Sequence, residues 1–305
     1  MVRIKMPKPP FIVKELIKDT ETITRGFGSL GYVADDELAT ILFLMVRLGK
    51  PLLLEGHPGV GKTEVANVLA AYLNTEVIRL QCYEGLDVNA AVYEWNYQKQ
   101  LLSIKIQESS DKTEAEKEAH IFSEEFMLKR PLLQSITRTE RAPVLLIDEI
   151  DRADEEFEAF LLELLSAFQI SIPEMGTIKA VHRPLVVLTS NRTRELSDAL
   201  KRRCLYHWVN FPDEEKERRI VQKHLPDIED QLLTRVIRVV QAIRQKKLEK
   251  TPGIAETLDW AQGLQALGFK ELTEEAMAKS LGCLLKSAND IERVKAEGLE
   301  EILAE

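Results

Sequence analysis

The sequence of 305 residues has few of the side chains that build covalent or metal-bound scaffolds. Its three cysteines, Cys82, Cys204 and Cys283, are odd in number and lie too far apart in the sequence for a C-x-x-C pair. Its five histidines show no metal-ligand spacing. These scarcities argue against a disulfide framework and a zinc site, and they favour reduced, buried thiols in a cytoplasmic protein.

Long apolar runs and an excess of positive charge are also missing. The run Ile41–Val46 is far too short to cross a bilayer, and Pro7, Pro9 and Pro10 interrupt the place where a signal peptide needs apolar residues. The net charge is −9, of which residues 213–305 contribute −4. We therefore expect no membrane span and no general binding to nucleic acid through phosphate neutralisation.

A glycine-rich segment carries the strongest functional signal. It fits the phosphate-binding pattern G-x-x-x-x-G-K-[S/T] and reads Gly56-His57-Pro58-Gly59-Val60-Gly61-Lys62-Thr63. An apolar strand pattern precedes it, and a helical pattern follows, with apolar residues at Val65, Val68, Leu69, Tyr72 and Leu73. Glycines let backbone N–H groups approach phosphate oxygens. We expect Lys62 to reach the outer phosphates and Thr63 to contact magnesium, whereas His57 fills a variable position.

Two adjacent acids follow a second apolar run. Val144–Ile147 predicts a buried strand that ends in Asp148 and Glu149. Beside a phosphate-binding loop, Asp148 is expected to hold magnesium through its water shell. Glu149 is expected to orient and polarise the water that attacks the γ-phosphate. Strands often end in acids, so this pair gains its meaning from the loop.

Polar residues also flank two further strand patterns. Leu185–Thr189 is followed by Asn191, a neutral group that can help Glu149 position water, although a strand-ending turn also explains it. Arg202 and Arg203 precede the last strand pattern. Adjacent arginines are usually solvated, but in a ring ATPase an arginine here crosses to the neighbouring subunit's γ-phosphate.

The order of these patterns predicts an α/β fold, a five-stranded parallel sheet with helices on both faces. The expected strands are Leu52–Leu54, Val77–Leu80, Val144–Ile147, Leu185–Thr189 and Leu205–Val209. Residues 1–34 are expected to be an irregular lead-in with a short helix at Phe11–Lys18. Residues 35–212 are expected to form the nucleotide-binding α/β domain, with an insertion at about 84–130 and a β-hairpin at about 168–181. Residues 213–305 are expected to be a small all-helical domain.

Together these elements resemble the AAA+ ATPases, and within them the MoxR family. The subgroup that contains carbon-monoxide-dehydrogenase accessory ATPases is similar in three blocks, Cys82–Asp87, Asp148–Phe157 and Ala255–Ala261. The resemblance implies a P-loop NTPase sheet followed by a helical lid. It also implies ATP and Mg²⁺ as cofactors.

Carried over to this sequence, the family pattern assigns Lys62 and Thr63 to nucleotide and magnesium. It makes Asp148 and Glu149 the Walker B pair and Asn191 sensor 1. Arg203 is the first choice for the arginine finger and Arg202 the second. The region Pro252–Glu256 contains no arginine where many AAA+ proteins carry sensor 2. Another basic residue would have to take that role.

The resemblance further implies a homo-oligomer, most simply a hexameric ring, that remodels or matures a client protein. The client would be a metalloenzyme that receives its cofactor, and a von Willebrand factor A domain protein would be a partner. The alternatives are a nucleotide-dependent switch with little turnover and a nucleic-acid motor or loader. Tyr93, Trp95 and Tyr97 in the insertion either grip a client or pack onto their own domain.

Overall fold

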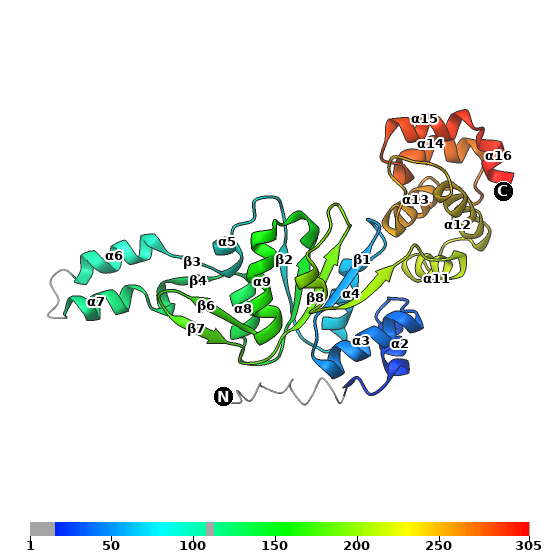
Figure 1. The fold of residues 1–305 in the computed structure, drawn as a ribbon. Helices are drawn as coiled ribbons and strands as arrows, with labels where there is room; N and C mark the ends of the chain where they lie inside the picture. Colours follow the sequence, from blue (N-terminus) through cyan, green and yellow to red (C-terminus); the bar gives the residue numbers. More distant parts are fainter. Residues whose placement is uncertain (1–15, 108–112, 305) are drawn as a thin grey trace. The chain divides into compact units, whose positions relative to one another are not determined.

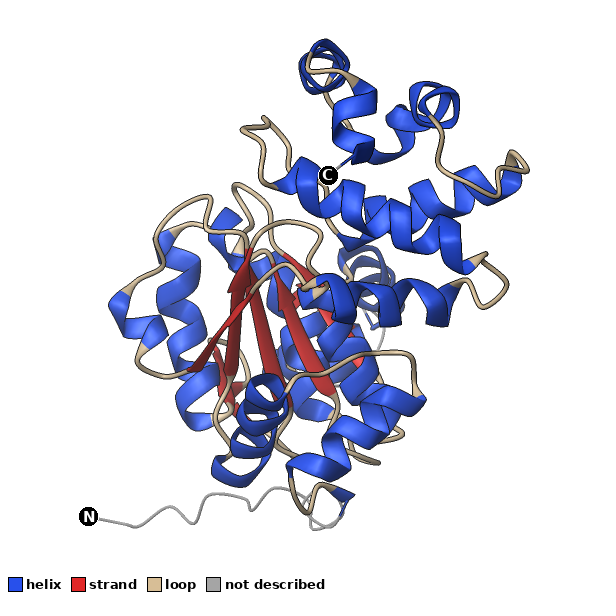
Figure 2. Ribbon diagram, turned by 90° about the vertical axis from the view of Figure 1, so that its right-hand side faces the viewer, coloured by secondary structure: helices blue, strands red, loops and turns tan. Residues whose placement is uncertain are grey.

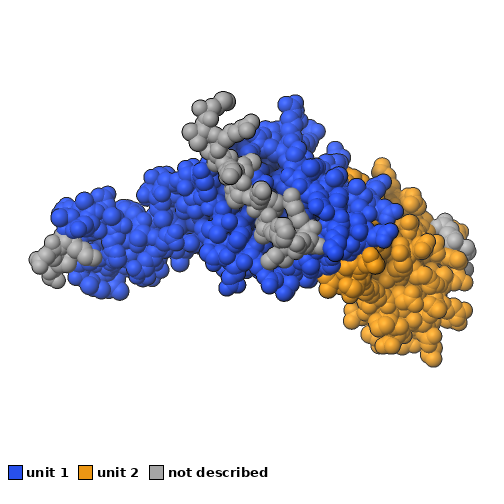
Figure 3. All heavy atoms as spheres, turned by 90° about the horizontal axis from the view of Figure 1, so that it is seen from below, with its two compact units in different colours: residues 1–23, 36–55, 66–207 blue, residues 24–35, 56–65, 208–305 orange. Residues whose placement is uncertain are grey.

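The computed structural model describes residues 16–107 and 113–304. The chain forms two compact units, which Figure 3 shows in blue and orange. The first unit comprises residues up to 23 together with residues 36–55 and 66–207. The second unit comprises residues 24–35, 56–65 and 208–305.

The first unit is built on a five-stranded parallel sheet, with helices lying against both of its faces (Figure 2). The strand order is β2-β5-β8-β1-β9, and all five predicted strands are confirmed. Their bounds are Leu52–Gly56 (β1), Val77–Gln81 (β2), Val144–Asp148 (β5), Leu185–Ser190 (β8) and Leu205–Val209 (β9).

Burial explains why the strand patterns could be recognised. The side chains of β1, β5 and β8 are buried along their whole length. A parallel sheet covered on both faces requires such continuous apolar strands. β2 lies at the end of the strand order and alternates between exposed and buried positions. Polar side chains such as Arg79 and Gln81 can therefore occupy one side of β2 at the edge of the sheet.

Helices connect the strands and cover the sheet. Their bounds are Asp36–Leu48 (α3), Lys62–Tyr72 (α4), Pro131–Thr137 (α8), Glu155–Ala167 (α9) and Asp198–Lys201 (α10). Asp154 caps α9 by accepting a hydrogen bond from the Phe157 N–H. The apolar stripe of α9, which includes Phe157, Leu161 and Leu164, packs in the hydrophobic core of this unit. The stripe therefore has the packing role that its spacing predicts.

The insertion after β2 contains more regular structure than a loop. It consists of α5 (Val88–Val92), β3 (Tyr93–Trp95), α6 (Tyr97–Gln107), α7 (Glu114–Ile121), a 3-10 turn and β4 (Met127–Lys129). β3 and β4 pair in antiparallel fashion, and α6 and α7 lie side by side (Figure 1). The charged segment from Glu108 to Glu118 forms part of α7 from Glu114 onward, and residues 108–112 lie outside the described residues.

The predicted β-hairpin is confirmed. β6 (Gln169–Ile172) and β7 (Gly176–Lys179) form an antiparallel pair in register from Gln169 opposite Lys179 to Ile172 opposite Gly176. Gly176 has a φ of 75°, a conformation that a turn tolerates most easily at glycine. The hairpin also contacts the insertion, because the Tyr93 hydroxyl donates to Glu174 over 3.3 Å.

The second unit is mostly helical. The residues after Pro212 form α11 (Glu214–His224), α12 (Asp230–Arg244), α13 (Ile254–Ala266), α14 (Glu274–Leu284), α15 (Ala288–Ala296) and α16 (Leu299–Ala304). Asp213 caps α11 by accepting a hydrogen bond from the Lys216 N–H. Trp260 is fully buried at the centre of this helical core. Among the helices described in either unit, none has the length and hydropathy that a membrane crossing requires.

The expectation of an irregular segment before residue 35 is wrong for residues 20–29. Thr20–Ser29 forms helix α2, and its side chains Ile23 and Phe27 are fully buried. These two residues stand four apart, which places them on one face of a helix. Two glycines, Gly26 and Gly28, weaken the helical pattern in the sequence, and packing overrides their low propensity. Most of the helix expected at Phe11–Lys18 lies outside the described residues.

Candidate active site

The phosphate-binding loop connects β1 to α4, as its sequence context predicts. Gly59 and Gly61 have φ values of 76° and 91°, which side chains other than glycine rarely adopt. A Cβ at Gly56 would lie 2.3 Å from the Val209 carbonyl oxygen, so this position also requires glycine. Lys62 is buried and its Nζ donates to the carbonyls of Gly56 and His57 at 2.8 and 2.7 Å.

The loop packs against the first turn of α13 within the second unit. The Ile254 N–H donates to the Gly59 carbonyl over 2.9 Å. Gly253 approaches Gly59 closely, and the Glu256 carboxylate accepts from the Gly253 N–H at 2.9 Å. His57 stacks on Phe211, with ring centroids 5.1 Å apart. His57 therefore has a packing contact beyond filling a loop position.

No arginine stands at the start of α13, but Arg244 of α12 lies next to it. Its Nε donates to the Pro252 carbonyl over 2.9 Å. The guanidinium also forms two hydrogen bonds to Glu217, at 2.6 and 2.7 Å, and lies over the ring of Phe211. The Arg244 and Glu217 side chains are 3% and 0% exposed. Arg244 thus holds the segment before α13 from inside the helical core.

Asp148 lies at the end of β5 and is 2% exposed. The Thr189 hydroxyl donates to one of its carboxylate oxygens over 2.5 Å. The other oxygen accepts from the Arg79 guanidinium, also over 2.5 Å. Thr189 and Arg79 stand on β8 and β2, the strands on either side of β5. The neighbouring strands therefore fix the orientation of this carboxylate.

Glu149 follows Asp148 and is held by three side chains. Asn191 donates its Nδ2 to Oε1 over 3.2 Å, and Gln81 donates its Nε2 to Oε2 over 3.1 Å. Arg152 forms an ion pair with the same carboxylate at 3.0 Å. The backbone of Glu149 has a φ of 55°, an uncommon conformation for a residue with a side chain. Strained backbone of this kind is found preferentially at functional sites.

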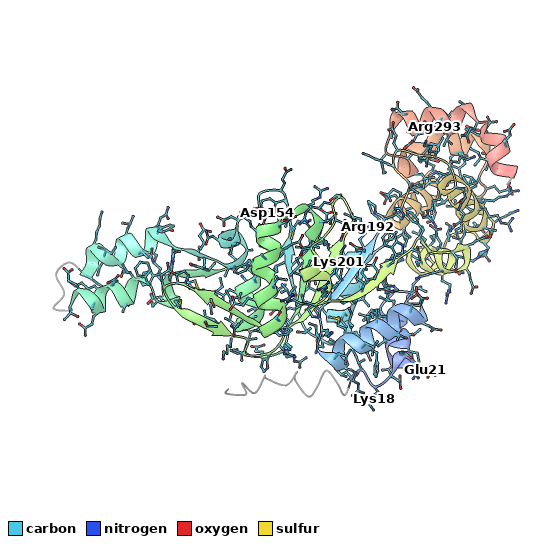
Figure 4. The ribbon with its side chains drawn as sticks, in the orientation of Figure 1. Lys18, Glu21, Asp154, Arg192, Lys201 and Arg293 are labelled. Carbon is cyan, nitrogen blue, oxygen red and sulfur yellow. The ribbon has the colours of Figure 1, made fainter. Side chains whose placement is uncertain are left out.

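The predicted pair of Glu149 and Asn191 is thus brought together by β5 and β8. Arg192 follows Asn191, and Asp154 stands at the start of α9; Figure 4 labels both at this edge of the sheet. β1 ends at the same edge, because Glu55 lies opposite Ser190 in the parallel register of β1 and β8. The phosphate-binding loop begins directly after Glu55. Ligands of open α/β sheets bind at this carboxyl end of the strands.

Asp151 is a further buried carboxylate at this edge, to which the sequence reasoning gave no role. It accepts from the N–H groups of Asn191 and Thr193 at 3.1 and 2.8 Å, and from the Thr193 hydroxyl at 2.7 Å. Burial raises the pKa of Asp151, but these hydrogen bonds outweigh it and hold the pKa below its usual range. Asp151 therefore fixes the backbone that carries Asn191.

The two candidate arginines have different surroundings. Arg203 is half-buried and donates to the Ser166 hydroxyl over 2.7 Å and to the Ala199 carbonyl over 2.8 Å. Arg202 is the C-cap residue of α10, and its side chain is exposed. Within this chain, Arg203 is engaged in internal contacts and Arg202 faces solvent.

The residues expected to hold magnesium have suitable chemistry. Magnesium prefers oxygen ligands and is usually held by one or two protein groups together with substrate phosphates and water. Thr63 and Asp148 supply a hydroxyl and a carboxylate. In the structure, Asp148 already pairs with a cation, the Arg79 guanidinium. Across residues 16–107 and 113–304, no group of three or more His, Cys, Asp or Glu side chains is arranged to hold a metal by itself.

Residues 51–204 match the family model described as AAA domain (dynein-related subfamily). The chain belongs to this family. The match spans the phosphate-binding loop, the Asp148-Glu149 pair and Asn191, and the five-stranded parallel sheet with its helical C-terminal region is the P-loop AAA+ fold.

The individual proteins that match this AAA protein share little sequence identity with it. YojN of Bacillus subtilis (strain 168), described as uncharacterized, is 26% identical over 244 residues, which cover 76% of this chain and 73% of YojN. Among solved structures, the RuvB Holliday junction branch migration motor of Thermotoga maritima is 19% identical with a TM-score of 0.44. The match covers 90% of this chain and 72% of RuvB. A point mutant of the same RuvB matches with 20% identity, a TM-score of 0.46 and the same coverage.

Proposed function

We propose that the protein is a magnesium-dependent ATPase in which the phosphate-binding loop and the Asp148-Glu149 pair act on one ATP molecule. The contact between Asn191 and Glu149 carries this proposal, because it joins the ends of β8 and β5 at the edge where β1 leads into the loop. An amide can hold a carboxylate in place without neutralising its charge. Such a carboxylate is suited to accept a proton from an attacking water.

Each residue of the site has a distinct part in this proposal. The loop N–H groups and Lys62 bind the β- and γ-phosphates. Thr63 and Asp148 would hold magnesium, which would supply positive charge beside the phosphates. Glu149 orients the water, and Asn191 fixes Glu149. Glu149 also contacts Arg152 and Gln81, which help Asn191 to hold its carboxylate in place.

Binding and metal use are tested first. Lys62→Ala should abolish the binding of fluorescent ATP analogues, and Asp148→Asn should remove most of the magnesium dependence of binding. Lys50→Ala provides a control, because Lys50 precedes β1 and is exposed. Retention of full ATP affinity in Lys62→Ala would contradict the proposal.

A second candidate function is a nucleotide-dependent switch with little turnover. Two observations favour it: both acids of the pair contact arginines, Arg79 and Arg152, and no arginine stands at the start of α13. A switch binds ATP and changes state without releasing phosphate at a useful rate. Phosphate release by the wild-type protein at saturating ATP distinguishes the two functions.

We propose further that ATP turnover remodels or matures a client protein, in keeping with the MoxR resemblance. A metalloenzyme client and a von Willebrand factor A domain partner follow from the same resemblance. The free thiols of Cys82, Cys204 and Cys283 support a cytoplasmic location. The insertion offers a surface for a client, because several large apolar side chains are exposed on α6 and β4, namely Tyr97, Leu101, Leu102, Ile106 and Leu128.

The aromatic residues of the insertion divide between the two roles considered for them. Trp95 is 7% exposed and packs against Tyr93 and Phe122 in the core of the first unit. Tyr97 is 65% exposed. We therefore assign Trp95 to packing and Tyr97 to client contact. Tyr97→Ala together with Leu101→Ala should preserve basal ATPase activity and abolish client capture by an ATP-trapped variant; retention of capture contradicts the assignment.

We also propose a homo-oligomeric ring, a hexamer by resemblance, in which an arginine from one subunit reaches the ATP of the next. The exposed Arg202 is the better candidate for this reach, because Arg203 is bonded to Ser166 and Ala199 of its own chain. Analytical ultracentrifugation with and without Mg·ATP tests assembly. A monomer at every accessible concentration would contradict both the ring and the shared site.

A further inference from the structure

Arg79 has a contact that nucleotide binding by itself does not explain. It stands on β2 and extends its guanidinium to the carboxylate of Asp148, 2.5 Å away. The Arg79 side chain is 55% exposed, whereas that of Asp148 is 3% exposed. A solvent-accessible cation thus neutralises a buried acid. Thr189 donates to one carboxylate oxygen of Asp148, and Arg79 donates to the other.

The same guanidinium is connected to the second acid. Arg79 also donates to the side-chain oxygen of Gln81, whose amide nitrogen donates to Glu149. Arg79 and Gln81 stand two apart on β2 and therefore point to the same face of the sheet. A movement of Arg79 away from Asp148 consequently frees Gln81 to change its bond to Glu149. One arginine on β2 thereby reaches both members of the acidic pair.

A buried carboxylate without a counter-charge is costly, and Arg79 supplies such a charge to Asp148. Repulsion between an arginine and a metal ion at the same carboxylate oxygen favours the presence of one of them at a time. Arg79 can leave at little cost, since its side chain is half-exposed on β2 at the end of the sheet. The buried pair of Arg244 and Glu217 has no such freedom.

We propose that Arg79 is the resting-state counter-ion of Asp148 and that magnesium displaces it when the nucleotide binds. This inference rests on the proposed function. Arg79 is a positioning residue: it sets the magnesium concentration at which the site becomes competent and keeps the acidic pair ordered without metal. The site is therefore built to pass from an arginine-bound state to a metal-bound state.

The test measures cation affinity and stability and does not depend on turnover. Wild type, Arg79→Ala and Arg79→Lys are each mixed with fluorescent ADP and titrated with Mg²⁺. Thermal unfolding of each protein is recorded without ligand and with Mg·ADP. Arg138→Ala is the matched control, because the Arg138 side chain is about as exposed as that of Arg79 and its ion pair with Glu76 does not involve the acidic pair. We expect Arg79→Ala to lower the Mg²⁺ concentration for half-maximal binding by about three- to fivefold, the range of a half-exposed ion pair.

The stability measurement has an expected sign of its own. Arg79→Ala should melt at a lower temperature than wild type without ligand, and Mg·ADP should reduce this deficit, because the variant is expected to bind Mg²⁺ more tightly and so gain more stability from the ligand. Arg79→Lys should restore part of both effects. If wild type binds Mg·ADP but Arg79→Ala needs the same Mg²⁺ concentration or a higher one, the role of Arg79 is overturned while the proposed function stands. If Asp148→Asn leaves the wild-type Mg²⁺ requirement unchanged, the proposed function fails as well.

Discussion

Gly253 lies against Gly59 so closely that a Cβ on Gly253 would stand 2.7 Å from the Gly59 carbonyl oxygen. The atoms that it would meet belong to the backbone of the phosphate-binding loop, which cannot yield as a flexible side chain does. The first turn of α13 is thus fitted to the loop by two glycines. Where many AAA+ proteins carry an arginine, this protein has a backbone contact.

Gly253→Ala should consequently separate the start of α13 from the loop. We expect a loss of about 1–3 kcal/mol in unfolding free energy and a weaker affinity for ATP, because the overlap forces a backbone shift. Gly282→Ala is the matched control, since nothing lies within 4 Å of the added Cβ. Calorimetry measures the stability of the two variants, and fluorescent-nucleotide titration measures their affinity for ATP. Unchanged ATP affinity in a destabilised Gly253→Ala would restrict the contact to packing.

The buried pair of Arg244 and Glu217 should be essential to the helical core. Glu217→Gln should lower the free energy of unfolding by about 3–5 kcal/mol, because it leaves a buried guanidinium without its counter-charge. The exposed pair of Lys279 and Glu275 is the control, and its loss should cost less than about 0.5 kcal/mol. Urea denaturation gives both values. Equal costs for the two pairs would show that the Arg244 network contributes no special stability.

The lowered pKa of Asp151 should make the stability of the protein depend on pH. Because its folded pKa lies below the usual value of about 3.9, its contribution is present above that pH and is lost as the pH falls through the folded pKa. Asp151→Asn should cost about 1–3 kcal/mol at pH 7. The difference from wild type should shrink at more acidic pH. Urea denaturation at pH 7 and at acidic pH measures the free energy of unfolding of both proteins. Asp213→Asn is the control, because asparagine also caps a helix.

The two arginines before β9 should differ in their effects. Arg202→Ala should lower ATP turnover with little change in ATP affinity, whereas Arg203→Ala should mainly lower stability, because it loses bonds to Ser166 and Ala199. Mixing Arg202→Ala with Glu149→Gln subunits provides a complementation test. Mixed rings contain some interfaces with neither defect, so activity should partly return. Confirmed mixed assembly without recovery would count against a shared site.

Local patterns predicted the strands and the loop, but not the contacts that tune the site. Val144–Ile147 and Leu185–Thr189 are buried on both faces of the sheet, so each appears as a continuous apolar run. The bond from Arg79 to Asp148 joins residues 69 positions apart, and that from Thr193 to Asp151 joins residues 42 apart. No periodicity in the sequence marks such pairs, because strand order decides them.

Helix α2 and the contact between Gly59 and Gly253 were not predicted for a related reason. The apolar residues Ile23 and Phe27 are too few to mark a helix beside two glycines, and burial supplies what propensity lacks. The glycine pattern around Gly59 pointed to phosphate binding. That Gly253 fits against the same loop depends on packing between segments nearly two hundred residues apart.

In the proposed mechanism, Glu149 polarises the attacking water while the loop binds the phosphates. Phosphate release and ATP affinity are compared in wild type, Glu149→Gln and the control Glu156→Gln, whose side chain is exposed on α9. We predict that Glu149→Gln binds ATP as wild type does and releases phosphate at least about tenfold more slowly, while Glu156→Gln matches wild type. Wild-type turnover by Glu149→Gln would show that Glu149 does not polarise the attacking water.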